Sequence, residues 1–334
     1  MGRSAGLQSW IGIPPTATEL NAWLNDASPD RFERKVDELL ARPEYGQRWG
    51  RHWMDVWRYS DWYGSRAINE IRYSQRHIWR WRDWIVDSLN TDKPYDRMIT
   101  EMLAADEIAA DDTTALAATG FLGRNWYKFD RNVWMFDTVE QTAQAFLAVT
   151  LRCARCHDHK YDPLSQTEYY QFRAFFEPHD VRTDPLSANL TTEKDATLGD
   201  VLKEGVSRIY DRELDVPTFV FQRGDNRYPD KDRPVSPAVP AFLGGSVDIQ
   251  PVHLPAAASD PHLRPAVLNG LIAAADRTIS EAQTALQQAH SKQQTADLAV
   301  AERQQQLATQ NPDQPTRQTA SEPPVPPIFA DDFH

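Results

Sequence analysis

Apolar residues recur at helical spacing through the first half of the chain, and this pattern predicts a mainly α fold up to about residue 180. Two sequences match capping boxes that start helices, one at Thr16 and Glu19 and one at Ser165 and Glu168. The Ser-Pro pair at 28–29 is expected to cap a further helix. The predicted helices after it cover residues 43–58, 75–90, 95–106, 113–122, 136–152 and 165–176.

The pattern changes over residues 186–262, where frequent prolines exclude long helices. The stretch Val216–Phe221, rich in β-branched and aromatic residues, predicts a strand. We therefore expect an irregular extension with a few short strands after a helical domain at residues 8–185.

A third pattern covers residues 263–309, where apolar positions alternate at spacings of four and three. This is the seam of a coiled coil, although Gln293 and Arg303 interrupt it. Its many alanines suit close pairing with another helix, from a second segment, a second copy or the helical domain. Residues 310–327 are predicted to be a Pro/Gln-rich linker, and residues 328–334 to be the start of a further, truncated β domain.

Composition narrows the classes of partner. The formal net charge of −12 argues against nucleic-acid binding, and no apolar run is long enough for a membrane helix. The chain contains 11 tryptophans. A spacing of four separates Trp49, Trp53 and Trp57, which is typical of a stripe of side chains packed in a core. Alternatively, the arginines interleaved with the tryptophans could bind the anionic edge of a cofactor, or the aromatic and arginine side chains together could bind a glycan.

The candidate chemistry lies at Cys153-Ala154-Arg155-Cys156-His157, which contains the only two cysteines. C-x-x-C-H is the spacing that attaches haem c, with both thiols bound to the macrocycle and the histidine ligating the iron. The motif is expected at the C-terminal end of a helix, before the turn at Asp162 and Pro163.

Two other interpretations of this motif stay open. A disulfide across two intervening residues would be a redox motif. A zinc site would use Cys153, Cys156 and either His157 or His159, although no second distant ligand pair is present. If His159 binds no zinc, it is expected to lie next to the metal ligand without binding the metal itself.

A low-spin haem needs a second axial ligand, which the motif does not supply. His52 and Met54 are the candidates, because the helix that carries them is expected to face the core. A helix turns residues two apart to different faces, so at most one of the two is expected to reach the iron.

Several separated segments together resemble a known family. They are Cys153–Pro163, Arg51–Tyr59, Ala118–Leu122, Arg223–Asp225 and Pro229–Pro234. In their order along the chain, they resemble the planctomycete cytochrome c-like family known as domain of unknown function 1549, over residues 8–185 and on to about 245. The resemblance implies a cytochrome-like helical domain with a c-type haem, in an exported multidomain protein of aquatic bacteria. It brings no settled catalytic activity.

The sequence thus predicts a haem c module, passing electrons to a redox partner protein or to adjacent domains of a longer chain. The first residues lack the apolar core of a secretory signal. Because haem c is attached outside the cytoplasm, we expect the full-length protein to be periplasmic or otherwise exported, with its export signal upstream of this sequence. A metal-stabilised scaffold or glycan-binding module is the alternative. An oxidase or peroxidase is a third interpretation, and no catalytic constellation is evident.

Overall fold

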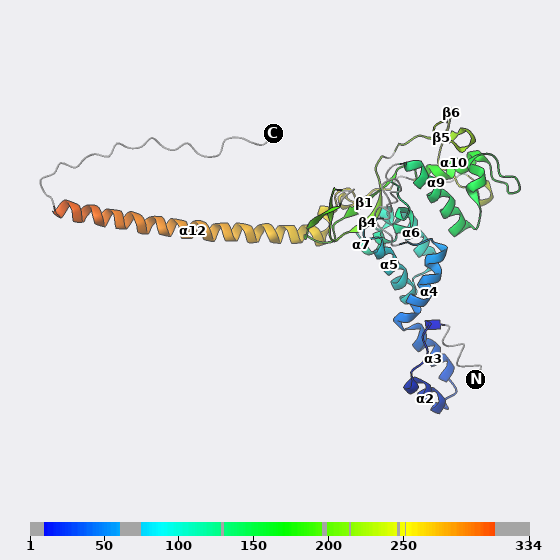
Figure 1. The fold of residues 1–334 in the computed structure, drawn as a ribbon, viewed down its shortest axis with the longest axis horizontal. Helices are drawn as coiled ribbons and strands as arrows, with labels where there is room; N and C mark the ends of the chain where they lie inside the picture. The colour runs from blue at the N-terminus through cyan, green and yellow to red at the C-terminus, as the bar shows by residue number, and fades with distance from the viewer. Residues whose placement is uncertain are drawn as a thin grey trace. The chain divides into compact units, whose positions relative to one another are not determined.

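The computed structural model describes residues 10–60, 75–127, 130–195, 199–213, 215–245, 248–250 and 252–310. The chain divides into two compact units, Met1–Leu271 and Ile272–His334. As predicted, it is mainly helical, with small antiparallel sheets and a long C-terminal helix (Figure 1). No helix in the described ranges is long and apolar enough to cross a membrane.

Five helices begin the first unit: α2 (Ala17–Asn25), α3 (Arg31–Leu40), α4 (Pro43–Val56), α5 (Trp79–Asn90) and α6 (Tyr95–Ile108). The capping box at Thr16 is present. The predicted start of the next helix is wrong, because α3 has Asp30 as its N-cap. The Ser28 hydroxyl instead bonds to the carboxylate of Asp26 and to Arg34.

The next helices are shorter than predicted: α7 (Thr113–Ala117), α8 (Gly120–Gly123), α9 (Arg131–Thr142) and α10 (Gln166–Ala174). A π-helical turn, η1, extends α9 over Ala143–Leu147. It ends at Ala148, whose positive φ of 56° stops the helix before the predicted residue 152. The capping box at Ser165 and Glu168 starts α10 as predicted.

Three two-stranded antiparallel sheets follow α10. They pair β1 (His179–Asp184) with β4 (Val206–Asp211), β2 (Thr192–Asp195) with β3 (Gly199–Leu202), and β5 (Thr218–Phe221) with β6 (Pro229–Val235). The predicted strand at 216–221 is therefore present as β5. The sequence boundary at 185/186 does not separate two units, because β1 and β4 pair across it.

The core of the first unit is rich in tryptophan, as the spacing predicted. Trp57, Trp81, Trp84 and Trp134 are buried, whereas Trp49 is exposed. Trp53 is half-buried and stacks on Trp57 at 5.0 Å between ring centroids. This packing fixes α4 against α5, and it joins both helices to α8 and α9.

Three short helical segments, η4 (Ala241–Leu243), α11 (Ala256–Ser259) and η5 (Pro261–Leu263), lead to α12 (Pro265–Gln310). The predicted long helix is thus confirmed. Residues 275–310 are all exposed, including the seam residues Ile279, Leu286 and Leu307. Pairing through this seam stays a prediction, and the predicted linker and truncated domain at 311–334 lie outside the described residues.

Candidate functional site

The C-x-x-C-H segment forms a short turn between α9 and α10. Its first part is the 3-10 helix η2 (Leu151–Arg155), in which residues three apart lie above one another. Leu151 and Ala154 are fully buried and hold the inner side of this turn. Cys153 and Cys156 have the same spacing of three, and they are an exposed and a half-buried free thiol, respectively.

His157 follows directly and is exposed. Its Nδ1 lies 2.7 Å from the backbone carbonyl oxygen of Asp158. A carbonyl oxygen only accepts hydrogen bonds, so Nδ1 carries the proton and donates. In the neutral ring, Nε2 therefore keeps its lone pair and is available as a ligand atom.

His159 has the opposite arrangement. Its Nδ1 accepts hydrogen bonds from the backbone N–H groups of Asp162, at 2.9 Å, and Tyr161, at 3.3 Å. The proton of the neutral ring is therefore on Nε2, and no lone pair is left for a metal. His159 supports the turn that follows His157, and it does not complete a zinc site in this arrangement.

The half-buried thiol of Cys156 is covered by a distant part of the chain. Gly224, with φ of +74°, ends the 3-10 turn η3 (Gln222–Gly224) after β5, and a Cβ placed there would lie 2.6 Å from Cys156 Sγ. Gln166 holds the two segments together, because its Nε2 donates to the carbonyl oxygens of Arg155, at 3.1 Å, and Phe221, at 3.0 Å.

Charges beside the turn are paired. Arg155 lies 3.2 Å from the carboxylate of Glu140, which Tyr169 and the exposed Arg152 also approach. Burial raises the pKa of Glu140, although the two arginines oppose the shift. Three of the arginines interleaved with the tryptophans, Arg76, Arg80 and Arg82, pair with Glu193, Glu204 and Asp83. Their contact with an anionic cofactor stays a prediction.

The structure leaves His52 away from the core and places Met54 against the core cluster, which also contains Ala154. His52 is exposed on α4, with its ring 5.6 Å from that of Trp49, so the expectation that it faces the core is wrong. Met54 is half-buried and packs against the core, where its methyl group lies beside Gly50. In the described contacts, neither side chain touches residues 153–157.

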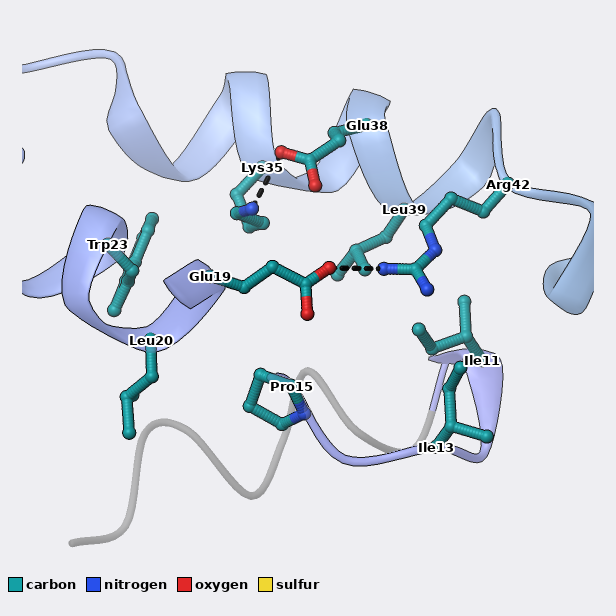
Figure 2. Close-up of a pocket in the computed structure, with 10 residues that line it drawn as sticks. All are labelled: Ile11, Ile13, Pro15, Glu19, Leu20, Trp23, Lys35, Glu38, Leu39 and Arg42. Atoms are coloured by element: carbon teal, nitrogen blue, oxygen red, sulfur yellow. Dashed lines mark hydrogen bonds and ion pairs between the residues drawn. The ribbon is translucent and has the colours of Figure 1, made fainter. Parts of the chain in front are cut away.

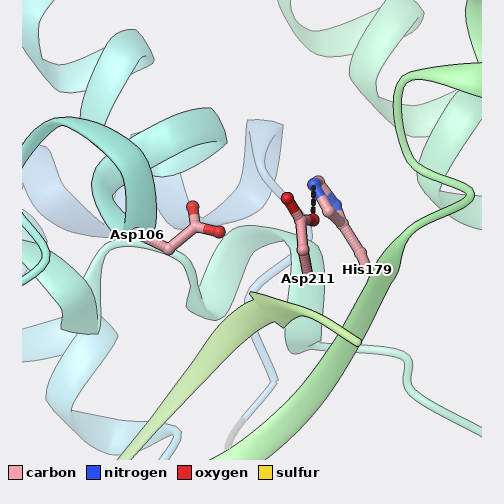
Figure 3. Close-up of side chains that lie close together, drawn as sticks. All are labelled: Asp106, His179 and Asp211. Atoms are coloured by element: carbon pink, nitrogen blue, oxygen red, sulfur yellow. Dashed lines mark ion pairs between the residues drawn. The ribbon is translucent and has the colours of Figure 1, made fainter. Parts of the chain in front are cut away.

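A second cluster, which the sequence analysis missed, joins Asp106, His179 and Asp211 (Figure 3). One ligand atom from each lies within 4.8 Å of the others. Burial raises the pKa of Asp106 to about 7, helped by the negative charges of Asp211 and Glu107. Burial also lowers the pKa of His179 to about 4 and raises that of Asp211. The three residues are far apart in the sequence, so no short motif predicts that they lie together.

A pocket lies near the N-terminus, between α2, α3 and residues 11–15 (Figure 2). Its walls are mainly apolar, with Ile11, Leu20 and Leu39 among them. Its charged groups pair with one another, since Arg42 binds Glu19 at 2.8 Å and Lys35 binds Glu38 at 2.6 Å. It contains none of the predicted site residues.

The turn, its two thiols and the helical unit that carries them define a mainly α protein with a C-x-x-C-H loop. The chain belongs to the family described as protein of unknown function (DUF1549), or PSCyt2, whose sequence profile matches residues 8–181. No curated protein and no solved structure matches the chain.

Proposed function

We propose that the turn of residues 153–157 attaches haem c, and that this protein is an electron-transfer module of a larger exported bacterial protein. The observation that carries the proposal is the arrangement of the donors. Two free thiols three residues apart lie beside an imidazole whose Nε2 lone pair is available. The residues present therefore fit this group.

Each residue has a definite role in this proposal. Cys153 and Cys156 hold the two thioether bonds, and His157 ligates the iron through Nε2. The carbonyl of Asp158 fixes the orientation of that ring, as partners of metal-bound histidines commonly do. The exposed guanidinium of Arg152 offers a cation for a propionate. When bound, the haem supplies a one-electron redox centre.

The electron would pass to a redox partner protein or to another domain of the full-length chain. The iron face opposite His157 decides between electron transfer and reaction with a small oxidant, because a second protein ligand closes that face. A glycan-binding or zinc-stabilised scaffold would use the same loop without redox chemistry.

The test is expression behind an export signal, together with a haem c maturation system. The product is expected to be red, to show sharp bands when reduced, and to keep its haem through acid-acetone extraction. The double variant Cys153→Ala/Cys156→Ala is expected to lose covalent haem. Cys156→Ala alone is expected to leave attachment through Cys153.

Controls separate loss of attachment from loss of folding. Circular dichroism of the double variant is expected to match that of the parent, because one thiol is exposed and the other half-buried. Covalent haem in the double variant would overturn the proposal. A colourless parent protein that retains zinc through these cysteines would favour the scaffold instead.

A further inference from the structure

We propose that Asp106, His179 and Asp211 bind a divalent transition-metal ion of the Zn²⁺ class, at a site separate from the C-x-x-C-H loop. The strand register accounts for two of the ligands. His179 begins β1 and Asp211 ends β4, and the two residues are direct partners in the antiparallel ladder. His179 Nε2 lies 3.6 Å from Asp211 Oδ1.

The third ligand comes from the end of α6. Ala104 breaks the helical geometry two residues before Asp106, with φ of −149° and ψ of 25°. The last turn of α6 then directs the carboxylate of Asp106 toward that of Asp211 (Figure 3). Three different elements thus converge at one point.

Three polar atoms of this cluster, one from each residue, are buried and accept or donate no hydrogen bond among the described residues. Asp106 is 4% exposed and His179 is 7% exposed. Among the described residues, no hydrogen bond reaches Oδ1 of Asp106, Nδ1 of His179 or Oδ1 of Asp211. Leaving a buried polar atom unpaired destabilises a fold, so a ligand that satisfies both carboxylates at once would stabilise this one.

Carboxylates outnumber cationic groups at this cluster. The negative charge of Asp211 disfavours the anionic forms of both Asp106 and half-buried Glu107, and Glu107 adds to the effect on Asp106. Two guanidinium groups that act electrostatically on this cluster, those of Arg208 and Arg131, are engaged elsewhere. Arg208 binds Asp184 at 2.6 Å, and Arg131 donates to the carbonyl oxygen of Glu177.

The donor set selects the class of metal. Mg²⁺ and Ca²⁺ prefer shells built from oxygen alone, whereas one imidazole nitrogen with two carboxylate oxygens suits zinc and its neighbours. In a tetrahedral zinc site, ligand atoms lie about 3.4 Å apart. The pair at 3.6 Å is already close to this spacing, and the full cluster within 4.8 Å needs only a modest contraction. A water would complete four-coordination.

The cluster lies near the surface of the first unit, because the side chain of Asp211 is 20% exposed. The site also spans two parts of the chain. Asp106 and His179 lie within the family match at residues 8–181, and Asp211 lies in the extension beyond it. Metal binding would therefore fasten the strand β4 to the helical domain.

The test uses the full chain with Cys153→Ser and Cys156→Ser, so that the thiols do not bind zinc. This protein is stripped with a chelator and titrated with Zn²⁺ by calorimetry, and its thermal midpoint is followed in parallel. We expect one Zn²⁺ per chain and a rise in the midpoint, with no rise for Mg²⁺ or Ca²⁺ at the same concentration.

Asp106→Asn in the same background is the decisive variant. It keeps the shape of the side chain and removes a buried charge, so the metal-free protein is expected to melt no lower than its parent. Its affinity for Zn²⁺ is expected to fall by at least about 100-fold, beyond what loss of an outer partner causes. Asp225→Asn, at a half-buried carboxylate paired with Arg227, is the matched control and is expected to bind like the parent.

Two outcomes would overturn the proposal. One is a stripped parent that neither binds Zn²⁺ nor gains stability from it, which would make the cluster a buried carboxylate that holds a proton. The other is an Asp106→Asn variant that binds Zn²⁺ as its parent does. Neither outcome bears on haem attachment, because both thiols are absent from the protein tested.

Discussion

Arg208 and Asp184 form an ion pair in the interior of the first unit, with Nε 2.6 Å from Oδ2 and side chains that are 2% and 1% exposed. Arg264 reaches the same Oδ2 at 2.8 Å, and Arg182 reaches Oδ1 at 2.7 Å. One carboxylate thus joins β1, β4 and the residue before α12. This cluster of charges holds residues 206–211 and Arg264, which follow the helical domain in the sequence, against β1.

Asp184→Asn is expected to destabilise the protein by about 3–5 kcal/mol, because it leaves buried guanidinium groups without their counter-charge. Urea unfolding measures this loss. The matched control is Asp26→Asn, which breaks an exposed pair with Arg34 and is expected to cost about 1 kcal/mol or less. Equal losses in both variants would contradict the role given to Asp184.

The same residue predicts an acid dependence of stability. Burial alone would raise the pKa of Asp184. The positive charges of Arg208, Arg182 and Arg264 outweigh burial, so the pKa lies below its ordinary value of 3.8. The unfolded chain therefore takes up this proton first as the pH falls. The contribution of Asp184 is present above about pH 4 and is lost as the pH falls through the lowered pKa.

This dependence is measured by urea unfolding between pH 5 and the most acidic pH at which the protein still folds. The difference in free energy of unfolding between the parent and Asp184→Asn is expected to shrink on the acid side. A difference that stays constant over this range would show that the carboxylate charge is not what stabilises the cluster.

Gly224→Ala is expected to destabilise the protein by about 1–3 kcal/mol, because a side chain there is strained and meets Cys156. Gly199→Ala is the control, since Gly199 has a similar φ of +81° but open space around a Cβ. In a Cys156→Ala background, the Gly224→Ala substitution is expected to cost less. If Gly224→Ala lowers the free energy of unfolding equally in both backgrounds, backbone strain alone accounts for the loss.

On the haem-loaded protein, His52→Ala is expected to leave the absorption spectrum unchanged, because His52 is exposed on α4 beside Trp49. His157→Ala is expected to shift the spectrum by removing the axial nitrogen while both thioether bonds remain. A change from six to five ligands in His52→Ala would instead place His52 at the iron.

Local sequence signals identified most helices correctly. Capping boxes at Thr16 and Ser165 need only residues three apart, and the structure has both. The wrong start of α3 has a local cause as well, since the Ser28 hydroxyl bonds to Asp26 and not to a backbone N–H of the helix. Helix ends set by a single residue of positive φ, such as Ala148, carry no such signal because alanine favours helices.

Sites built by tertiary packing were outside the reach of the sequence. The spacing of Cys153 and Cys156 is visible because both residues lie on one turn. Asp106, His179 and Asp211 meet only through a strand register and a helix kink, and neither is encoded in a short window. The direction of His52 was likewise decided by which face of α4 packs on α5.

The approach of Gly224 to Cys156 imposes an order of events on biosynthesis. The glycine follows the cysteine by many residues, and its turn lies against the sulfur in the folded chain. If the proposed attachment needs both sulfurs uncovered, it would have a time window that closes when the β5–β6 hairpin packs against the motif. Variants that delay docking would lengthen that window, and the yield of modified protein would report it.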